Sequence, residues 1–232
     1  ALYNRLSRLK RFGFLVEDAG HDAAARIIEH LERGKHVVLE FGRYGSDLAA
    51  YILASNLLTR RIHNRYVARK EAAEGGGGAE PRHLVIVIEE AHKFLSTGIA
   101  SQTIFGTIAR ELRKYNVTLM VIDQRPSAID SEVMSQLGTR LTCLLDNDRD
   151  VEAALSGTAG SRQLREILAR LEPKQQALIY GHALPMPVVI STREYGSEES
   201  YARLVNRASG RDDEDGTETP EERLEREIKE LF

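Results

Sequence analysis

Two pairs of polar side chains stand directly after apolar segments, where strands of a sheet would end. Glu89 and Glu90 follow the run Leu84–Ile88, and Asp123 and Gln124 follow a second apolar run. Successive acids leaving a buried strand are costly unless they are paired, hydrogen-bonded or bound to a metal ion. Such a pair suits nucleotide hydrolysis, with one carboxylate holding the Mg²⁺ shell and the next polarising the attacking water. A glutamine on the neighbouring strand would orient that water or sense the γ-phosphate.

The same residue types allow a second interpretation. Glu89 and Glu90 would also suit the start of a helix after the strand, where negative charge faces the positive end of the helix dipole. Residue types alone leave both interpretations open. For His92, two positions further on, the commoner role of a hydrogen-bonded helix residue is expected.

Strands and helices alternate around these residues. The continuous apolar run Leu84–Ile88 is typical of a strand buried on both faces, and Val117–Ile122 and Arg140–Leu145 are expected as a second and a third such strand. This alternation predicts an α/β fold whose parallel sheet is covered by helices on both faces. The other expected elements are strands at 36–41, 176–180 and 188–191 and helices at 2–14, 23–31, 47–70, 103–115, 149–155, 162–171 and 201–208. The glycine run 75–78 is expected as a flexible linker.

Composition is that of a globular protein, with 232 residues of which 42% are hydrophobic and 29% charged. No run approaches the ~18 apolar residues that a membrane span requires, and no charged-then-apolar leader begins the chain. The single cysteine, Cys143, lies in an apolar run and is expected to be buried; it provides neither a disulfide framework nor a thiolate metal cluster. We therefore expect a cytoplasmic protein with no membrane partner.

Charge is unevenly distributed. The net charge is −3, but residues 211–230 contain ten acidic and four basic residues, so the rest of the chain is mildly basic. The densest basic stretch would either meet phosphates or form a solvated helix face; it comprises Arg60, Arg61, Arg65, Arg69 and Lys70.

The flanks are expected to differ from the core, which we place at residues 35–209. Residues 1–34 read as a helical segment, and 210–219 as an acidic linker. A capping box with Pro220 at the first helical position begins a helix over 220–232. Its narrow apolar stripe cannot form a core, so we expect this helix to dock on a neighbouring subunit.

Four short segments occur in order at compact spacing: Val85–His92, Ile108–Asn116, Asp123–Ser127 and Gln136–Arg140. Together they resemble the HerA family of hexameric DNA-translocating ATPases, within the HerA/FtsK group of RecA-like motors. The resemblance is strongest over residues 35–192. It implies a RecA-like, mostly parallel sheet, ATP and Mg²⁺ as cofactors, double-stranded DNA as a partner, a homo-hexameric ring, and a NurA-type nuclease acting with it in DNA end resection and repair.

The resemblance also implies roles for individual residues. Glu89 and Glu90 end a Walker B strand, with Glu89 holding Mg²⁺ through water and Glu90 acting as the catalytic base. Most Walker B strands have Asp at the first position, so Glu89 is a departure. Gln124 is the implied sensor, in contact with nucleotide.

An arginine that reaches a neighbouring subunit's nucleotide is also implied. Arg113 is the first candidate, Arg110 the second and Arg140 the third. Arg110 and Arg113 stand three apart on the expected helix and so share a face. The alternative is that they only make the surface soluble, as the adjacent Lys114 would.

The sequence contains no G-x-x-x-x-G-K-[ST] phosphate loop: Gly34–Lys35 lacks the upstream glycine and the Ser/Thr, and Gly157–Gly160 lacks the lysine. In the family this loop lies upstream of the resembling region, and the first residue is Ala1 rather than Met. We therefore expect a C-terminal portion of a longer ATPase, inactive alone. Two alternatives stay open: a conjugation- or secretion-type pumping ATPase, and a non-enzymatic scaffold that binds DNA or a nuclease.

Overall fold

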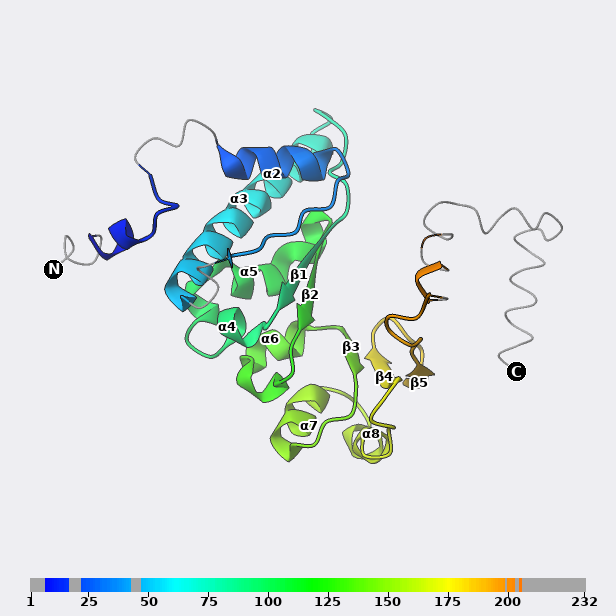
Figure 1. The fold of residues 1–232 in the computed structure, drawn as a ribbon. Coiled ribbons are helices and arrows are strands. Elements are labelled where there is room, and N and C mark those ends of the chain that lie inside the picture. Colours follow the sequence, from blue (N-terminus) through cyan, green and yellow to red (C-terminus); the bar gives the residue numbers. More distant parts are fainter. Residues whose placement is uncertain (1–6, 17–21, 43–46, 199, 203–204, 206–232) are drawn as a thin grey trace.

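A computed structural model describes residues 7–16, 22–42, 47–198, 200–202 and 205 (Figure 1). The expected linker at 210–219 and helix at 220–232 lie outside these residues. In chain order the elements are η1 (Arg8–Arg11), α2 (Ala23–Glu32), α3 (Leu48–Glu74), β1 (Leu84–Glu89), α4 (His92–Leu95), η3 (Ala100–Gln102), α5 (Ile104–Glu111), η4 (Leu112–Tyr115), β2 (Val117–Ile122), η5 (Pro126–Ala128), α6 (Ser131–Gln136), β3 (Thr139–Thr142), α7 (Asp148–Leu155), α8 (Ser161–Leu168), β4 (Gln176–Gly181) and β5 (Val188–Ser191). None of the described helices combines the length and apolar character that a membrane crossing requires.

The first sheet consists of β1 and β2, which pair in parallel from Leu84 opposite Val117 to Glu89 opposite Ile122. The connection passes through α4 and α5, and its length allows the second strand to return in the same direction. The predicted α/β class and the parallel pairing of these two strands are therefore confirmed. The expected helix at 103–115 is divided into α5 and the 3₁₀-helix η4.

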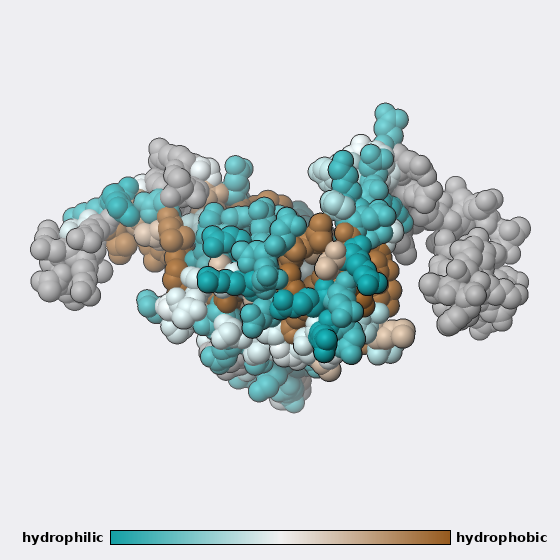
Figure 2. All heavy atoms as spheres, turned by 90° about the horizontal axis from the view of Figure 1, so that it is seen from below, coloured by the Kyte–Doolittle hydropathy of each residue, from teal (hydrophilic) through white to brown (hydrophobic). Residues whose placement is uncertain are grey.

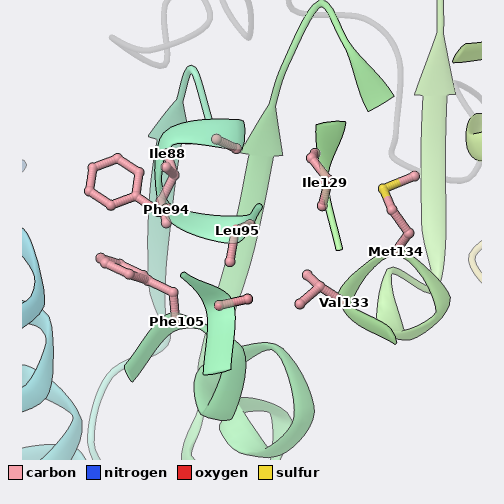
Figure 3. Close-up of a cluster of buried hydrophobic side chains, with 9 residues drawn as sticks. Ile88, Phe94, Leu95, Phe105, Ile129, Val133 and Met134 are labelled. Carbon is pink, nitrogen blue, oxygen red and sulfur yellow. The ribbon is translucent and has the colours of Figure 1, made fainter. Parts of the chain in front are cut away.

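Helices pack on one face of this sheet. Phe94 from α4 and Phe105 from α5 have ring centroids 5.0 Å apart, and Ile88 of β1 lies beside them (Figure 3). The same cluster continues to Val133 and Met134 of α6. A second cluster joins α2, α3, α5 and β2 through Ile28, Ile62, Tyr66, Ile104, Ile108 and Val117.

The opposite face of the sheet is half exposed, contrary to the expected burial of both faces. Val85 and Val87 of β1 are 48% and 52% exposed, and Met120 and Ile122 of β2 are 50% and 42% exposed. The register places these four side chains on the same face. Figure 2 shows hydrophobic surface, in brown, between hydrophilic areas of the view from below.

The basic stretch of α3 is engaged within the chain. Arg61 bonds to Asp22, and Arg65 and Arg69 both reach Glu32 of α2 at 2.9 and 3.1 Å. Each of these exposed ion pairs contributes little to stability, but each pairs an arginine with a carboxylate of the same chain. The arrangement favours the helix-face interpretation over a phosphate-binding patch.

The second sheet is antiparallel, in the order β3–β4–β5, which corrects the expectation that these strands continue a parallel sheet. For β4 and β5 the physical reason lies in their connection, which spans only residues 182–187 and includes two prolines. Parallel neighbours need a crossover of a dozen residues or more, whereas a short turn reverses the chain. Helices α7 and α8 pack on this sheet through Leu155, Leu168, Leu178 and Tyr180.

Two further expectations are wrong. Residues 36–41 form no strand: the segment has no ladder partner in the described chain, and Val38 is 93% exposed. Residues of this segment and of β1 both line a groove of about 850 Å³, and no backbone hydrogen bond joins the two among the described residues. Cys143 is exposed, not buried, because β3 ends at Thr142 and the cysteine follows the sheet.

Candidate active site

Glu89 and Glu90 leave β1 through a strained turn. Glu89 is the last residue of the strand, and Glu90 has φ of 52° in the left-handed region that favours glycine. For a glutamate this conformation costs of order 1–3 kcal/mol, so neighbouring contacts must hold it. The next residue, Ala91, is fully buried and its N–H donates to the carbonyl of Ile122 at 3.4 Å. Both glutamate side chains are exposed at the sheet edge.

Asp123, which follows β2, supplies the contacts that fix this turn. Its Oδ2 accepts from the backbone N–H of His92 and from the His92 Nδ1, both at 2.8 Å. Its Oδ1 accepts from the backbone N–H of Arg125 at 2.6 Å. The Asp123 side chain is only 3% exposed. One buried carboxylate therefore ties the end of β1 to the end of β2.

The surroundings of Glu90 are polar on one side and aromatic on the other. His92 Nε2 lies 3.9 Å from Glu90 Oε2, and Lys93 Nζ lies 4.0 Å from the same oxygen. Tyr51 of α3 packs against Phe94 with ring centroids 4.7 Å apart. Burial, and then the negative charges of Glu89 and Glu90, raise the pKa of the Tyr51 phenol above its ordinary value.

Gln124 lies at the same edge, because Ile122, two positions before Gln124, is the residue opposite Glu89 in the parallel register. The Gln124 side chain is exposed. The predicted meeting of the two polar strand ends is thus confirmed. The roles assigned to Glu89, Glu90 and Gln124 stay predictions. The sequence pattern indicates no role for Tyr51; it places Asp123 at the edge and His92 in a helix, but it does not predict their contact.

Two of the three candidate arginines lie toward the other end of the strand pair, and the third belongs to the second sheet. Arg110 is in α5 and Arg113 in η4, close to the start of β2, whereas Glu89 is opposite the end of β2. Arg140 is in β3 and is half buried. Its guanidinium donates to the carbonyls of Met134, Ala154 and Ser156 at 2.6, 2.6 and 2.7 Å, which ties the sheet to the ends of α6 and α7. These contacts favour a structural role for Arg140.

Within the described residues no group of three or more His, Cys, Asp or Glu side chains could hold a metal ion by itself. Magnesium keeps several waters and commonly takes one or two carboxylates together with substrate phosphates. The exposed carboxylate of Glu89 beside Glu90 fits such a cation, and the donors are hard oxygens as Mg²⁺ prefers.

Sequence comparison finds similar proteins among DNA repair helicases. DNA double-strand break repair helicase HerA of Pyrococcus furiosus is 32% identical over 131 residues, 50% of this chain and 24% of the helicase. HerA of Saccharolobus solfataricus is 30% identical over 71% of this chain and 32% of its own length. HerA of Sulfurisphaera tokodaii is 31% identical over 81% of this chain and 36% of its own length. The chain thus spans about a quarter to just over a third of the length of these helicases, and the predicted resemblance is confirmed.

No protein-family model matches the chain. Among solved structures, the genome packaging NTPase of Sulfolobus turreted icosahedral virus 2 in complex with AMP superposes with a TM-score of 0.48 at 13% identity, over 72% of each chain.

Proposed function

Because this chain is a relative of the HerA helicases, we propose that it carries the hydrolytic edge of an ATP-driven translocase acting on double-stranded DNA. One observation carries this proposal: two exposed carboxylates end β1 beside Gln124, on the neighbouring parallel strand. Ligands of parallel α/β sheets gather at the carboxyl ends of the strands, which is where these residues lie.

In this proposal each residue of the edge has a separate task. Glu89 holds hydrated Mg²⁺, and Glu90 accepts the proton of the water that attacks the γ-phosphate. Gln124 orients that water or contacts the γ-phosphate. The bound Mg²⁺ neutralises charge on the transferring phosphoryl group.

The chain alone should not hydrolyse ATP, because its 232 residues contain no loop with glycines, lysine and Ser/Thr spaced to cradle the β- and γ-phosphates. We propose that it works within a longer protein, as the length of its relatives suggests. That protein would act as a homo-hexameric ring with a NurA-type nuclease in DNA end resection.

Glu90→Gln in the full-length protein tests the proposal. Loss of a general base should lower turnover by about 10²–10⁴-fold, while ATP binding stays near that of the wild type. Glu152→Gln makes the same change on the exposed surface of α7 and should leave turnover unchanged. Steady-state hydrolysis and equilibrium binding of ATP measure the two effects. Undiminished turnover in Glu90→Gln would remove Glu90 from the mechanism.

Subunit mixing tests the arginine that acts in trans. Rings of Arg113→Ala subunits and rings of Glu90→Gln subunits should each be inactive. Mixed rings should regain part of the activity, because some interfaces then combine an intact Glu90 with an intact Arg113. Absence of recovery, with mixing verified by tagged subunits, would argue against Arg113; the same experiment with Arg110→Ala tests the second candidate.

DNA binding should depend on phosphates more than on sequence. A ring would turn its basic surfaces toward the pore, although the chain has a net charge of −3. We expect the dissociation constant of a duplex to rise steeply between 50 and 200 mM salt, with little sequence preference (on the order of 10³-fold for six phosphate contacts). Binding that is insensitive to salt, or that requires one sequence, would contradict a translocase.

A further inference from the structure

The polar edge contains a buried carboxylate to which the proposed reaction gives no role. The Asp123 side chain is almost completely buried, and its two oxygens accept three hydrogen bonds. Two of these contacts come from His92, which belongs to a different strand end, 31 residues away in sequence. The backbone contacts tie the two strand ends together, and the contact to the imidazole ring adds a side chain to this network.

That contact fixes the orientation of the His92 ring. Because a carboxylate oxygen only accepts, the hydrogen between the two groups belongs to Nδ1 of the imidazole. The second ring nitrogen, Nε2, then points toward the Glu90 carboxylate, 3.9 Å away. A carboxylate that orients one imidazole nitrogen also fixes where the other nitrogen lies. Nε2 attracts the Glu90 carboxylate when it too carries a hydrogen, because both nitrogens are donors only in the doubly protonated ring.

Glu90 itself has few fixed neighbours. Its side chain is 49% exposed, and its backbone is in the left-handed region. Lys93 is the other polar neighbour, but its ammonium is at 4.0 Å on a flexible side chain. His92, anchored on a buried carboxylate, is the rigid one.

We propose that Asp123 and His92 are positioning residues: Asp123 orients the His92 ring, and the ring holds the Glu90 carboxylate in the place required for hydrolysis. The inference rests on the proposed role of Glu90 as the catalytic base. It also gives a physical link between the polar end of β2, where Gln124 lies, and the base at the end of β1.

His92→Asn distinguishes the contact between Asp123 and His92 from the contact between His92 and Glu90. The asparagine amide can still donate to Asp123 in place of Nδ1, but no atom of it reaches the position of Nε2 beside Glu90. In the full-length protein we expect kcat for ATP hydrolysis to fall about 10- to 100-fold, as small misplacements of catalytic groups do. The KM for ATP should change less than about twofold, and His92→Ala should show the same split.

Two controls identify the cause. His83→Asn is the matched control. His83 directly precedes β1, at the opposite end of the strand pair, and its hydrogen bond among those described is to Thr118. This variant should leave kcat unchanged. In a Glu90→Gln background, single-turnover hydrolysis should show no further loss from His92→Asn, because the residue acts through Glu90. The melting temperature of each variant verifies that the turn is still folded.

Several outcomes would overturn the inference. Wild-type kcat in His92→Asn combined with a loss in His92→Ala would mean that the ring only braces Asp123. An equal loss from His92→Asn with and without Glu90→Gln would mean that it acts elsewhere. If Glu90→Gln alone keeps full turnover, the proposed function fails first; if Glu90→Gln is inactive but both His92 variants are active, only the positioning role fails.

Discussion

Replacing Arg140 by methionine should destabilise the protein, because this arginine joins the second sheet to two helices. Methionine keeps the aliphatic stem and removes the donors. Three carbonyls then lose a charged donor, although Ala154 keeps the Tyr180 hydroxyl at 2.7 Å and Met134 keeps the Leu137 amide at 3.3 Å. Bonds to charged groups contribute about 1.5–3 kcal/mol each. With two of the three carbonyls partly compensated, we expect a loss of about 2–4 kcal/mol.

Urea unfolding of the chain measures this loss. With an m-value of about 2 kcal/mol per molar, the midpoint should fall by about 1–2 M urea. Arg140→Lys should lie between Arg140→Met and the wild type, because one ammonium cannot reproduce the planar fork of donors. Arg193→Met, which removes an exposed arginine after β5, is the matched control. An unchanged midpoint in Arg140→Met would refute the structural role and return Arg140 to the candidates for a finger.

Two further predictions concern the fold. Gly181→Ala should cost at least about 2 kcal/mol in the same urea assay, since φ at Gly181 is 114° and a Cβ would lie 2.1 Å from the Gly138 carbonyl oxygen; an unchanged midpoint would mean that the turn relaxes freely. The hydrogen bond from Arg65 holds the pKa of Glu32 below its ordinary value. The stabilisation is therefore present above the unfolded pKa of about 4.3 and is lost as pH falls through the lower folded value. Glu32→Gln should thus lose less stability than the wild type between pH 5 and pH 3, and parallel curves of midpoint against pH would contradict this.

The sequence is sufficient to predict the first sheet, in which each strand pairs with the next strand along the chain. Runs of β-branched residues predicted β1 and β2, and the intervening helix made their parallel pairing the natural outcome. The meeting of Glu89 and Gln124 at one edge follows from that topology alone. The segment 36–41 has an equally strand-like composition, but a strand also needs a neighbour at hydrogen-bond distance, and composition does not specify one.

The sequence does not predict the role of a side chain whose partners are distant in the chain. Arg140 was a candidate finger because of its position in a motif, yet its donors are occupied by carbonyls that only tertiary packing brings to it. The contact between His92 and Asp123 also crosses from one strand to the next. Both residues were visible in the motifs, but motif spacing does not give the partner of a polar group.

The positions of Arg110 and Arg113 bear on how a complete site could be assembled. Both precede β2, whose first residue is opposite Leu84, while the glutamates follow the opposite end of β1. Five residue steps of strand separate these ends, about 17 Å at 3.3 Å per residue. The backbone of Arg110 and of Arg113 therefore lies toward the end of the strand pair opposite to the glutamates. This placement supports the proposal that such an arginine serves the nucleotide of a second copy, and in that proposal hydrolysis depends on contact between subunits.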